Sequence, residues 1–83
     1  MKRFEYTVTD PNGLHARPAG MLVKKAQTLS GEATIECRGK SANLTRLLAV
    51  MGLGIRHGDT VTVTLEGSEE EARELKRFFE ENF

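Results

Sequence analysis

Gly13-Leu14-His15-Ala16-Arg17-Pro18-Ala19 is the stretch around which the chain is organised, because an amphipathic helix begins within it. His15 directly precedes the helical pattern, so we expect it at the position of a helix cap. Arg17 falls in the first turn, where the helix macrodipole favours an anion over a cation. Pro18 is tolerated there because the first amides of a helix have no intrahelical partner. A titratable ring, a fixed positive charge and free amides therefore meet at one helix end.

This combination is typical of a site for a phosphate-like anion. The guanidinium of Arg17 suits phosphate oxygens, and the positive helix end favours an uncharged, nucleophilic imidazole. We hypothesise that His15 accepts a phosphoryl group, which the backbone amides of Ala16 and Arg17 and the Arg17 side chain then hold. On residue chemistry alone, an exposed capping histidine beside an incidental arginine is the commoner explanation and stays open.

Size and composition exclude several classes of protein. The 83 residues predict one domain, 1–83, and the 12 basic residues equal the 12 acidic ones, so no global field attracts nucleic acid or a membrane. A single cysteine, Cys37, excludes an internal disulfide framework and is expected as a packed structural thiol. Widely spaced histidines and cysteine predict no zinc site, and no cofactor is expected. Without a signal-peptide run or a membrane-spanning stretch, we expect a soluble, cytoplasmic protein, and its small size favours a monomer.

Hydrophobic periodicity predicts seven elements. Alternating residues predict strands over 3–8, 32–38, 41–43 (weak) and 60–66, and helical spacing predicts helices over 16–29, 45–53 and from a cap at Ser68 onward. Ser68 and Glu71 form a capping box, and Asn43 or Thr45 could cap the short helix. Because every strand has one apolar face, we expect an α+β, open-faced β-sandwich (βαββαβα), with a four-stranded antiparallel sheet and three helices on one face. The first crossover leaves room for the last strand between the first two.

The short helix is apolar on nearly all sides. Helical spacing places Val50 and Leu53 on one side and Leu47, Leu48 and Met51 on another. One group should pack inward, while the other stays as an exposed apolar patch of the kind that marks protein interfaces. Met21 and Lys24 of the first helix should face the same solvent region. Complete burial of the short helix is the alternative that the pattern leaves open.

The signature that begins at Gly13 resembles the active site of HPr, the histidine-containing phosphocarrier of the bacterial phosphoenolpyruvate-dependent sugar phosphotransferase system. The resemblance continues through residues 39–44 (Gly-Lys-Ser-Ala-Asn-Leu) and 50–54 (Val-Met-Gly-Leu-Gly). It implies that His15 takes a phosphoryl group through Nδ1 from phosphorylated enzyme I and passes it to a histidine of an enzyme IIA component. It also implies that Arg17 neutralises the phosphoryl oxygens. The patch that docks both partners would comprise Met21, Leu47, Leu48 and Met51, with Lys24 at its rim.

The chain departs from many HPr proteins at one position. Ungapped alignment places Arg46 where HPr proteins of low-GC Gram-positive bacteria carry a regulatory serine, and arginine is no substrate for a serine kinase. Thr45 is adjacent and is a minor candidate for that role. A regulatory paralogue, using the same phosphohistidine for nitrogen-type or transcriptional signalling, is the alternative function. An RNA-recognition module is disfavoured by the neutral charge and scarce aromatics, and His57 is expected to be a solvated loop residue.

Overall fold

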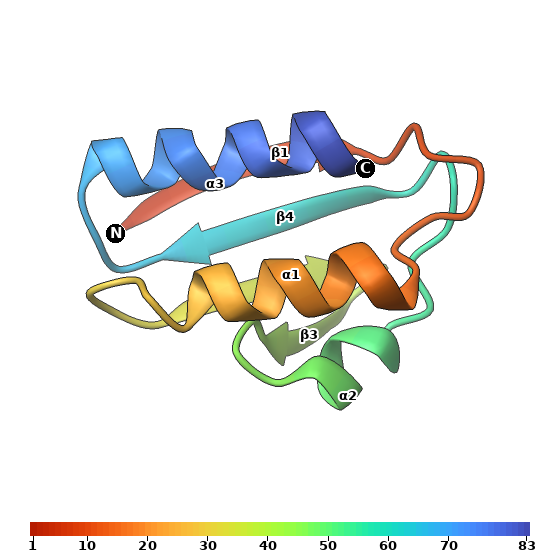
Figure 1. Cartoon of the computed structure of the whole chain (residues 1–83), viewed down its shortest axis with the longest axis horizontal. Coiled ribbons are helices and arrows are strands. Elements are labelled where there is room, and N and C mark those ends of the chain that lie inside the picture. Colours follow the sequence, from red (N-terminus) through yellow and green to blue (C-terminus); the bar gives the residue numbers. More distant parts are fainter.

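The computed structural model describes all residues from 1 to 83 and contains seven elements in the predicted order (Figure 1). The strands are β1 (Lys2–Thr7), β2 (Ala33–Cys37), β3 (Lys40–Asn43) and β4 (Thr60–Leu65). The helices are α1 (Ala16–Ala26), α2 (Leu47–Met51) and α3 (Glu69–Asn82).

The four strands form one antiparallel sheet in the order β1-β4-β2-β3. The last strand therefore lies between the first two, as the sequence predicts. Helices α1 and α3 lie side by side across one face of the sheet, and α2 packs beside α1 near β3 (Figure 1). The predicted open-faced sandwich is confirmed.

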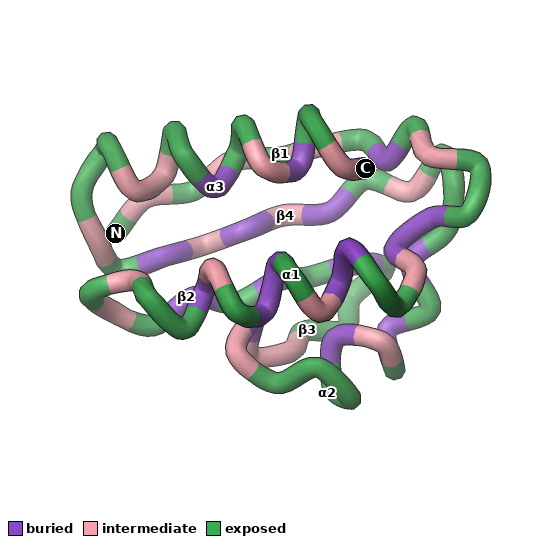
Figure 2. Tube along the Cα trace, viewed as in Figure 1, coloured by how far each residue is buried: buried purple, intermediate pink, exposed green.

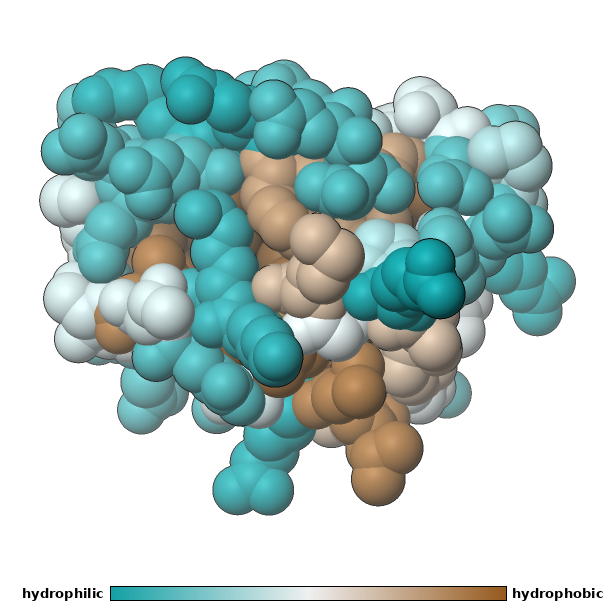
Figure 3. Space-filling view, viewed as in Figure 1, coloured by the Kyte–Doolittle hydropathy of each residue, from teal (hydrophilic) through white to brown (hydrophobic).

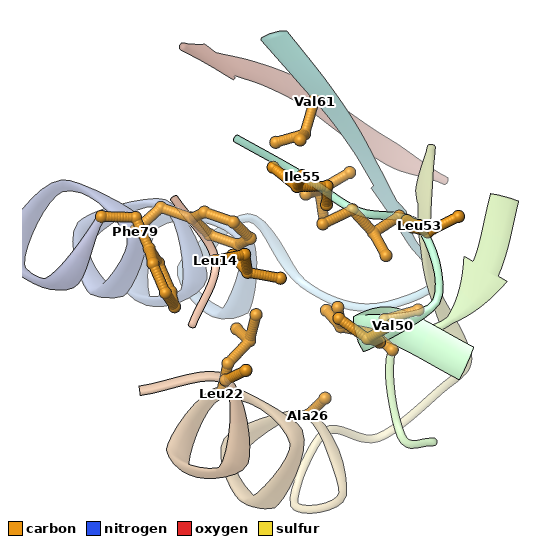
Figure 4. Close-up of a cluster of buried hydrophobic side chains, with 14 of the residues drawn as sticks. Leu14, Leu22, Ala26, Val50, Leu53, Ile55, Val61 and Phe79 are labelled. Atoms are coloured by element: carbon orange, nitrogen blue, oxygen red, sulfur yellow. The ribbon is translucent and has the colours of Figure 1, made fainter. Parts of the chain in front are cut away.

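The core lies between the sheet and the helices and is apolar throughout, with no buried polar or charged side chain. Buried residues follow one face of the inner strands β2 and β4 and the inner stripe of α1 and α3, whereas the edge strands β1 and β3 have only partly buried residues on their inner faces (Figure 2). Side chains from the loops before α1 and after α2, including Leu14 and Ile55, join the helical Leu22 and Phe79 in this core (Figure 4). Cys37 belongs to the same core with 2% of its surface exposed, so its predicted packing is confirmed.

Two helices are shorter than the periodicity predicts. Helix α1 ends at Ala26 because the following amides of Thr28 and Leu29 donate to carbonyls three residues back, and the Thr28 hydroxyl also donates to Lys25 O. Leu29 thus packs against the core from a turn that continues the helical stripe. Apolar spacing does not distinguish such tight turns from a regular helix.

Helix α2 begins later than expected, and its predicted cap is wrong. Arg46 occupies the N-cap position, with no side-chain cap. The Asn43 carboxamide oxygen accepts instead from the amide and hydroxyl of Thr45, at 2.9 and 2.6 Å. Asn43 therefore closes a turn before the helix rather than capping it.

The predicted start of α3 is confirmed. Ser68 is the N-cap, its hydroxyl accepts from Glu71 N, and the Glu71 carboxylate accepts from Ser68 N. The same carboxylate accepts from the amide and hydroxyl of Ser30, at 3.0 and 2.9 Å. Hydrogen bonds from Ser68 and Ser30 hold the pKa of Glu71 below its usual value, so this ionised carboxylate also joins α3 to the turn after α1.

Candidate functional site

The loop from Asp10 to Leu14 fixes where α1 begins. Asn12 N donates to Asp10 Oδ1 at 2.8 Å and Gly13 N donates to Asp10 O at 2.9 Å, which closes an Asx-type turn. Leu14 N then donates to Ile55 O at 3.1 Å, and the Leu14 side chain enters the core (Figure 4). The residue before His15 is thus held by both backbone and side chain.

Gly13 is required by the close approach of two loops. Its φ is +64°, and a Cβ at this position would lie 2.5 Å from Ile55 O and 2.8 Å from the Cα of Arg56. No side chain fits there without moving backbone. The glycine of the signature therefore allows the loop before α1 to pack directly on the segment that follows α2.

A second set of contacts holds that segment. Arg38, in a left-handed conformation with φ 51°, donates to the carboxylate of Asp59 and to the carbonyls of Leu53 and Gly54. The Asp59 carboxylate also accepts from Arg56 N at 2.8 Å. Sequence periodicity gives no signal for this cluster, although it braces the backbone against which Gly13 packs.

His15 is the N-cap residue of α1, as predicted, with φ −87° and ψ 167°. Its carbonyl accepts from Ala19 N at 3.0 Å, but its side chain does not cap the helix. The ring is 40% exposed, and Nε2 lies 3.4 Å from Asp10 Oδ2. A capping histidine would direct its ring at the helix amides, so this ring instead leaves those amides free for another ligand.

Asp10 is the part of the site that sequence reasoning missed. The hydrogen bond from Asn12 N lowers the pKa of Asp10, and the His15 hydrogen bond and charge act in the same direction, with a contribution from His57. Its carboxylate is therefore ionised at neutral pH beside the ring. In the sequence, Asp10 is recognisable only as an aspartate that opens a turn five residues before His15. Turn residues alone do not indicate which side chain a carboxylate will face, so its contact with the ring could not be predicted.

Arg17 lies in the first turn of α1 and is exposed. Its guanidinium forms no ion pair or side-chain hydrogen bond, and the first turn contains no acidic residue. With Ala16 preceding it and Pro18 lacking an N–H, the helix end offers amide donors and a free cation at the same place. This arrangement is suited to an oxyanion attached to, or approaching, His15.

An exposed apolar surface continues from this helix end. A shallow groove between α1 and the start of α2 has mixed apolar and basic walls, comprising Arg17, Gly20, Met21, Val23, Lys24, Gln27 and Leu47. Leu48 and Met21 are 86% and 51% exposed. Figure 3 shows the corresponding hydrophobic projection at the lower edge of the molecule, where Figure 1 places α2. We call Met21, Leu47 and Leu48 the apolar patch.

Met51 differs from the other predicted patch residues. It is half-buried and packs against the core, whereas helical spacing predicts it on the outer side with Leu47 and Leu48. Val50 and Leu53 are buried as expected. Helix α2 has only five residues, so Met51 is its last residue. The chain turns back toward the core directly after it, which brings Met51 into contact with the core.

The remaining candidates lie outside the His15 site. Arg46 is exposed at the start of α2, Thr45 is half-buried with its hydroxyl donated to Asn43, and His57 is exposed in the loop before β4. No group of three histidine, cysteine or acidic side chains is arranged to hold a metal ion. None of the helices has the length and apolar character required to cross a bilayer.

Comparisons with known proteins identify the same family throughout the chain. A family model described as the PTS HPr component phosphorylation site matches residues 2–81. The chain is 42% identical over 71 residues to phosphocarrier protein HPr of Lysinibacillus sphaericus, covering 86% of this chain and 81% of that relative. HPr-C-His from Thermoanaerobacter tengcongensis has a TM-score of 0.88 at 32% identity, covering 96% of this chain and 92% of that one. A phosphocarrier protein HPr from Bacillus anthracis has a TM-score of 0.85 at 34% identity, covering 94% and 95%.

Proposed function

The chain belongs to the HPr family of phosphocarriers of the phosphotransferase system, and on this premise we propose that His15 accepts a phosphoryl group from phosphorylated enzyme I. The group then passes to a histidine of an enzyme IIA component during sugar uptake. The protein acts as a carrier in this relay, as a single-domain monomer in the cytoplasm. The observation that carries the proposal is the partly exposed His15 ring at an uncapped helix end with Arg17 beside it.

In the proposed step, the lone pair of His15 Nδ1 forms a bond to phosphorus while the bond from phosphorus to the donor group of enzyme I breaks. The donor keeps the electron pair of the broken bond. The phosphoryl oxygens are held by the amides of Ala16 and Arg17 and by the Arg17 guanidinium. This role of the two amides and the guanidinium is supported by the first turn of α1, which has no side-chain cap and no acidic residue to compete for them.

Docking is proposed to use the apolar patch, with Lys24 at its rim and Met51 contributing its exposed part. The groove that contains Met21 and Leu47 also contains Arg17. A partner seated on the patch would therefore cover the helix end, exclude water from the reacting groups and strengthen their electrostatic interactions.

The direct test is to incubate the protein with enzyme I and phosphoenolpyruvate and to measure its intact mass. We expect one acid-labile phosphoryl group, absent in His15→Ala. Arg17→Ala should still fold, because the side chain is exposed and unpaired, but should be phosphorylated more slowly. A matched control is Arg77→Ala, which removes an exposed arginine from α3.

Phosphorylation of His15→Ala would move the acceptor elsewhere and refute the proposal. Transfer from the phosphorylated protein should then be measured to sugar-type and nitrogen-type enzyme IIA components. Efficient transfer to the sugar type supports the proposed branch. Transfer to the nitrogen type alone would favour the regulatory paralogue.

A further inference from the structure

Asp10 contacts the ring nitrogen of His15 that does not attack phosphorus in the proposed reaction. The distance from His15 Nε2 to Asp10 Oδ2 is 3.4 Å. We propose that Asp10 is a positioning residue that holds His15 in the tautomer protonated at Nε2, which leaves the Nδ1 lone pair free for attack. The inference rests on the proposed role of His15 as phosphoryl acceptor.

Hydrogen bonds to neighbouring backbone groups orient the Asp10 carboxylate toward the His15 ring. Oδ1 is occupied by the amide of Asn12 at 2.8 Å, so Oδ2 is the oxygen that faces His15. The Asp10 backbone is fixed at both ends: its amide donates to Phe83 O at 2.7 Å and its carbonyl accepts from Gly13 N at 2.9 Å. With 24% of its side chain exposed, Asp10 lies in a partly enclosed position rather than free in solvent.

An ionised carboxylate is only an acceptor, so the ring nitrogen that faces it must carry the proton. The hydrogen bond from Asn12 and the interaction with His15 both lower the pKa of Asp10, which keeps it in that acceptor form at neutral pH. Neutral imidazole has one ring proton. Holding this proton on Nε2 therefore prevents it from blocking Nδ1.

The same carboxylate is placed to offset charge during transfer. When Nδ1 bonds to phosphorus, the ring retains its Nε2 proton and gains positive charge, which Asp10 faces directly. Two other charged or titratable groups act on this region. Arg17 lies on α1 next to the phosphoryl position, and His57, in the loop before β4, interacts electrostatically with Asp10.

A purely structural role for Asp10 makes a different prediction. Asparagine closes an Asx turn as well as aspartate does, so Asp10→Asn should change neither the tautomer of His15 nor its phosphorylation if Asp10 only closes the turn. In the proposed role, the substitution changes both. If Oδ1 keeps accepting from Asn12, the carboxamide presents its NH₂ group to His15, and a donor there favours a ring proton on Nδ1.

The first experiment measures the tautomer of His15 by long-range ¹H–¹⁵N correlation in the unphosphorylated protein above neutral pH. We expect protonated Nε2 in the wild type and a shift toward protonated Nδ1 in Asp10→Asn. Backbone amide signals of Gly13 and Leu14 check that the loop is retained. Asp10→Ser, which keeps a short acceptor without the charge, serves as a second variant should the asparagine variant misfold.

The second experiment measures phosphorylation by enzyme I. We expect kcat to fall by about 10-fold or more in Asp10→Asn, with KM nearly unchanged because the apolar patch is intact. Unchanged tautomer and kcat in a folded variant would overturn the role of Asp10 while leaving His15 as the acceptor. Failure of enzyme I to phosphorylate the wild type would refute the proposed function instead, and the tautomer measurement would still decide whether Asp10 directs the ring.

Discussion

Replacing Leu48 with alanine is expected to slow phosphoryl transfer while leaving the folded protein as stable as before. Leu48 is 86% exposed, so truncation removes almost no contact within the protein. Surface changes of this kind alter the free energy of unfolding by about 0.5 kcal/mol or less. Any larger effect on transfer must therefore come from contact with a partner.

The size of the docking effect follows from the exposed area. Complete burial of a leucine side chain contributes about 1.5 to 3 kcal/mol, and alanine retains part of that surface. If a partner covers Leu48, the variant should lose about 1 to 2 kcal/mol of binding free energy, which is about 5- to 30-fold in affinity. We expect this loss of affinity to raise the KM of enzyme I for the variant protein as its substrate, with little change in kcat.

Leu44→Ala is the matched control, because Leu44 is the same residue type near α2 but is 0% exposed. Its truncation should lower the free energy of unfolding by about 2 to 5 kcal/mol. Urea denaturation separates the two variants, and initial rates with enzyme I at a temperature where both are folded measure transfer. An unchanged KM for Leu48→Ala, or a loss of stability comparable to that of Leu44→Ala, would refute the exposed docking patch.

Three further predictions test the scaffold. Gly13→Ala should lower the free energy of unfolding, measured by urea denaturation, by about 1 to 3 kcal/mol, because φ is positive at this position and the added Cβ would meet Ile55 O. It should also slow phosphorylation of the adjacent His15. Glu71→Gln should flatten the acid dependence of stability: the folded carboxylate has a pKa below the ordinary 4.5, so its stabilisation is present above that pH and is lost as the pH falls through the folded value. Arg46→Ser should stabilise α2 by about 0.5 to 1 kcal/mol, since a serine can cap a helix that now has no side-chain cap, whereas Arg46→Ala should give no such gain.

The sequence predicts most of the fold because the strands and long helices are set by local alternation and by one capping box. Residues 60–66 alternate cleanly, and the corresponding β4 lies between β1 and β2, as the crossover between the first two strands predicts. The errors occur where hydrogen bonds compete with periodicity. The Asn43 side chain accepts from Thr45 rather than from the first turn of α2, and the amides of Thr28 and Leu29 donate to carbonyls three residues back.

The candidate site was predictable in part for the same reason. The placement of His15 and the free first turn follow from local sequence, and the structure confirms His15 as the N-cap. Neither Asp10 facing the ring nor the half-burial of Met51 could be predicted, since each depends on how a turn brings separate segments together. The phosphoryl-acceptor role of His15 and the role of Arg17 stay predictions until the transfer experiments are done.

The burial of Cys37 has a practical consequence for following these reactions. Desolvation raises the pKa of its thiol, so reagents that need an exposed thiolate should react with it slowly. A cysteine introduced at Thr34, an exposed position on β2, would then be the one site that a maleimide dye modifies rapidly. The dye would sit on the side of the sheet away from the helices, where it can report association with a partner in real time without obstructing the surface at which they meet.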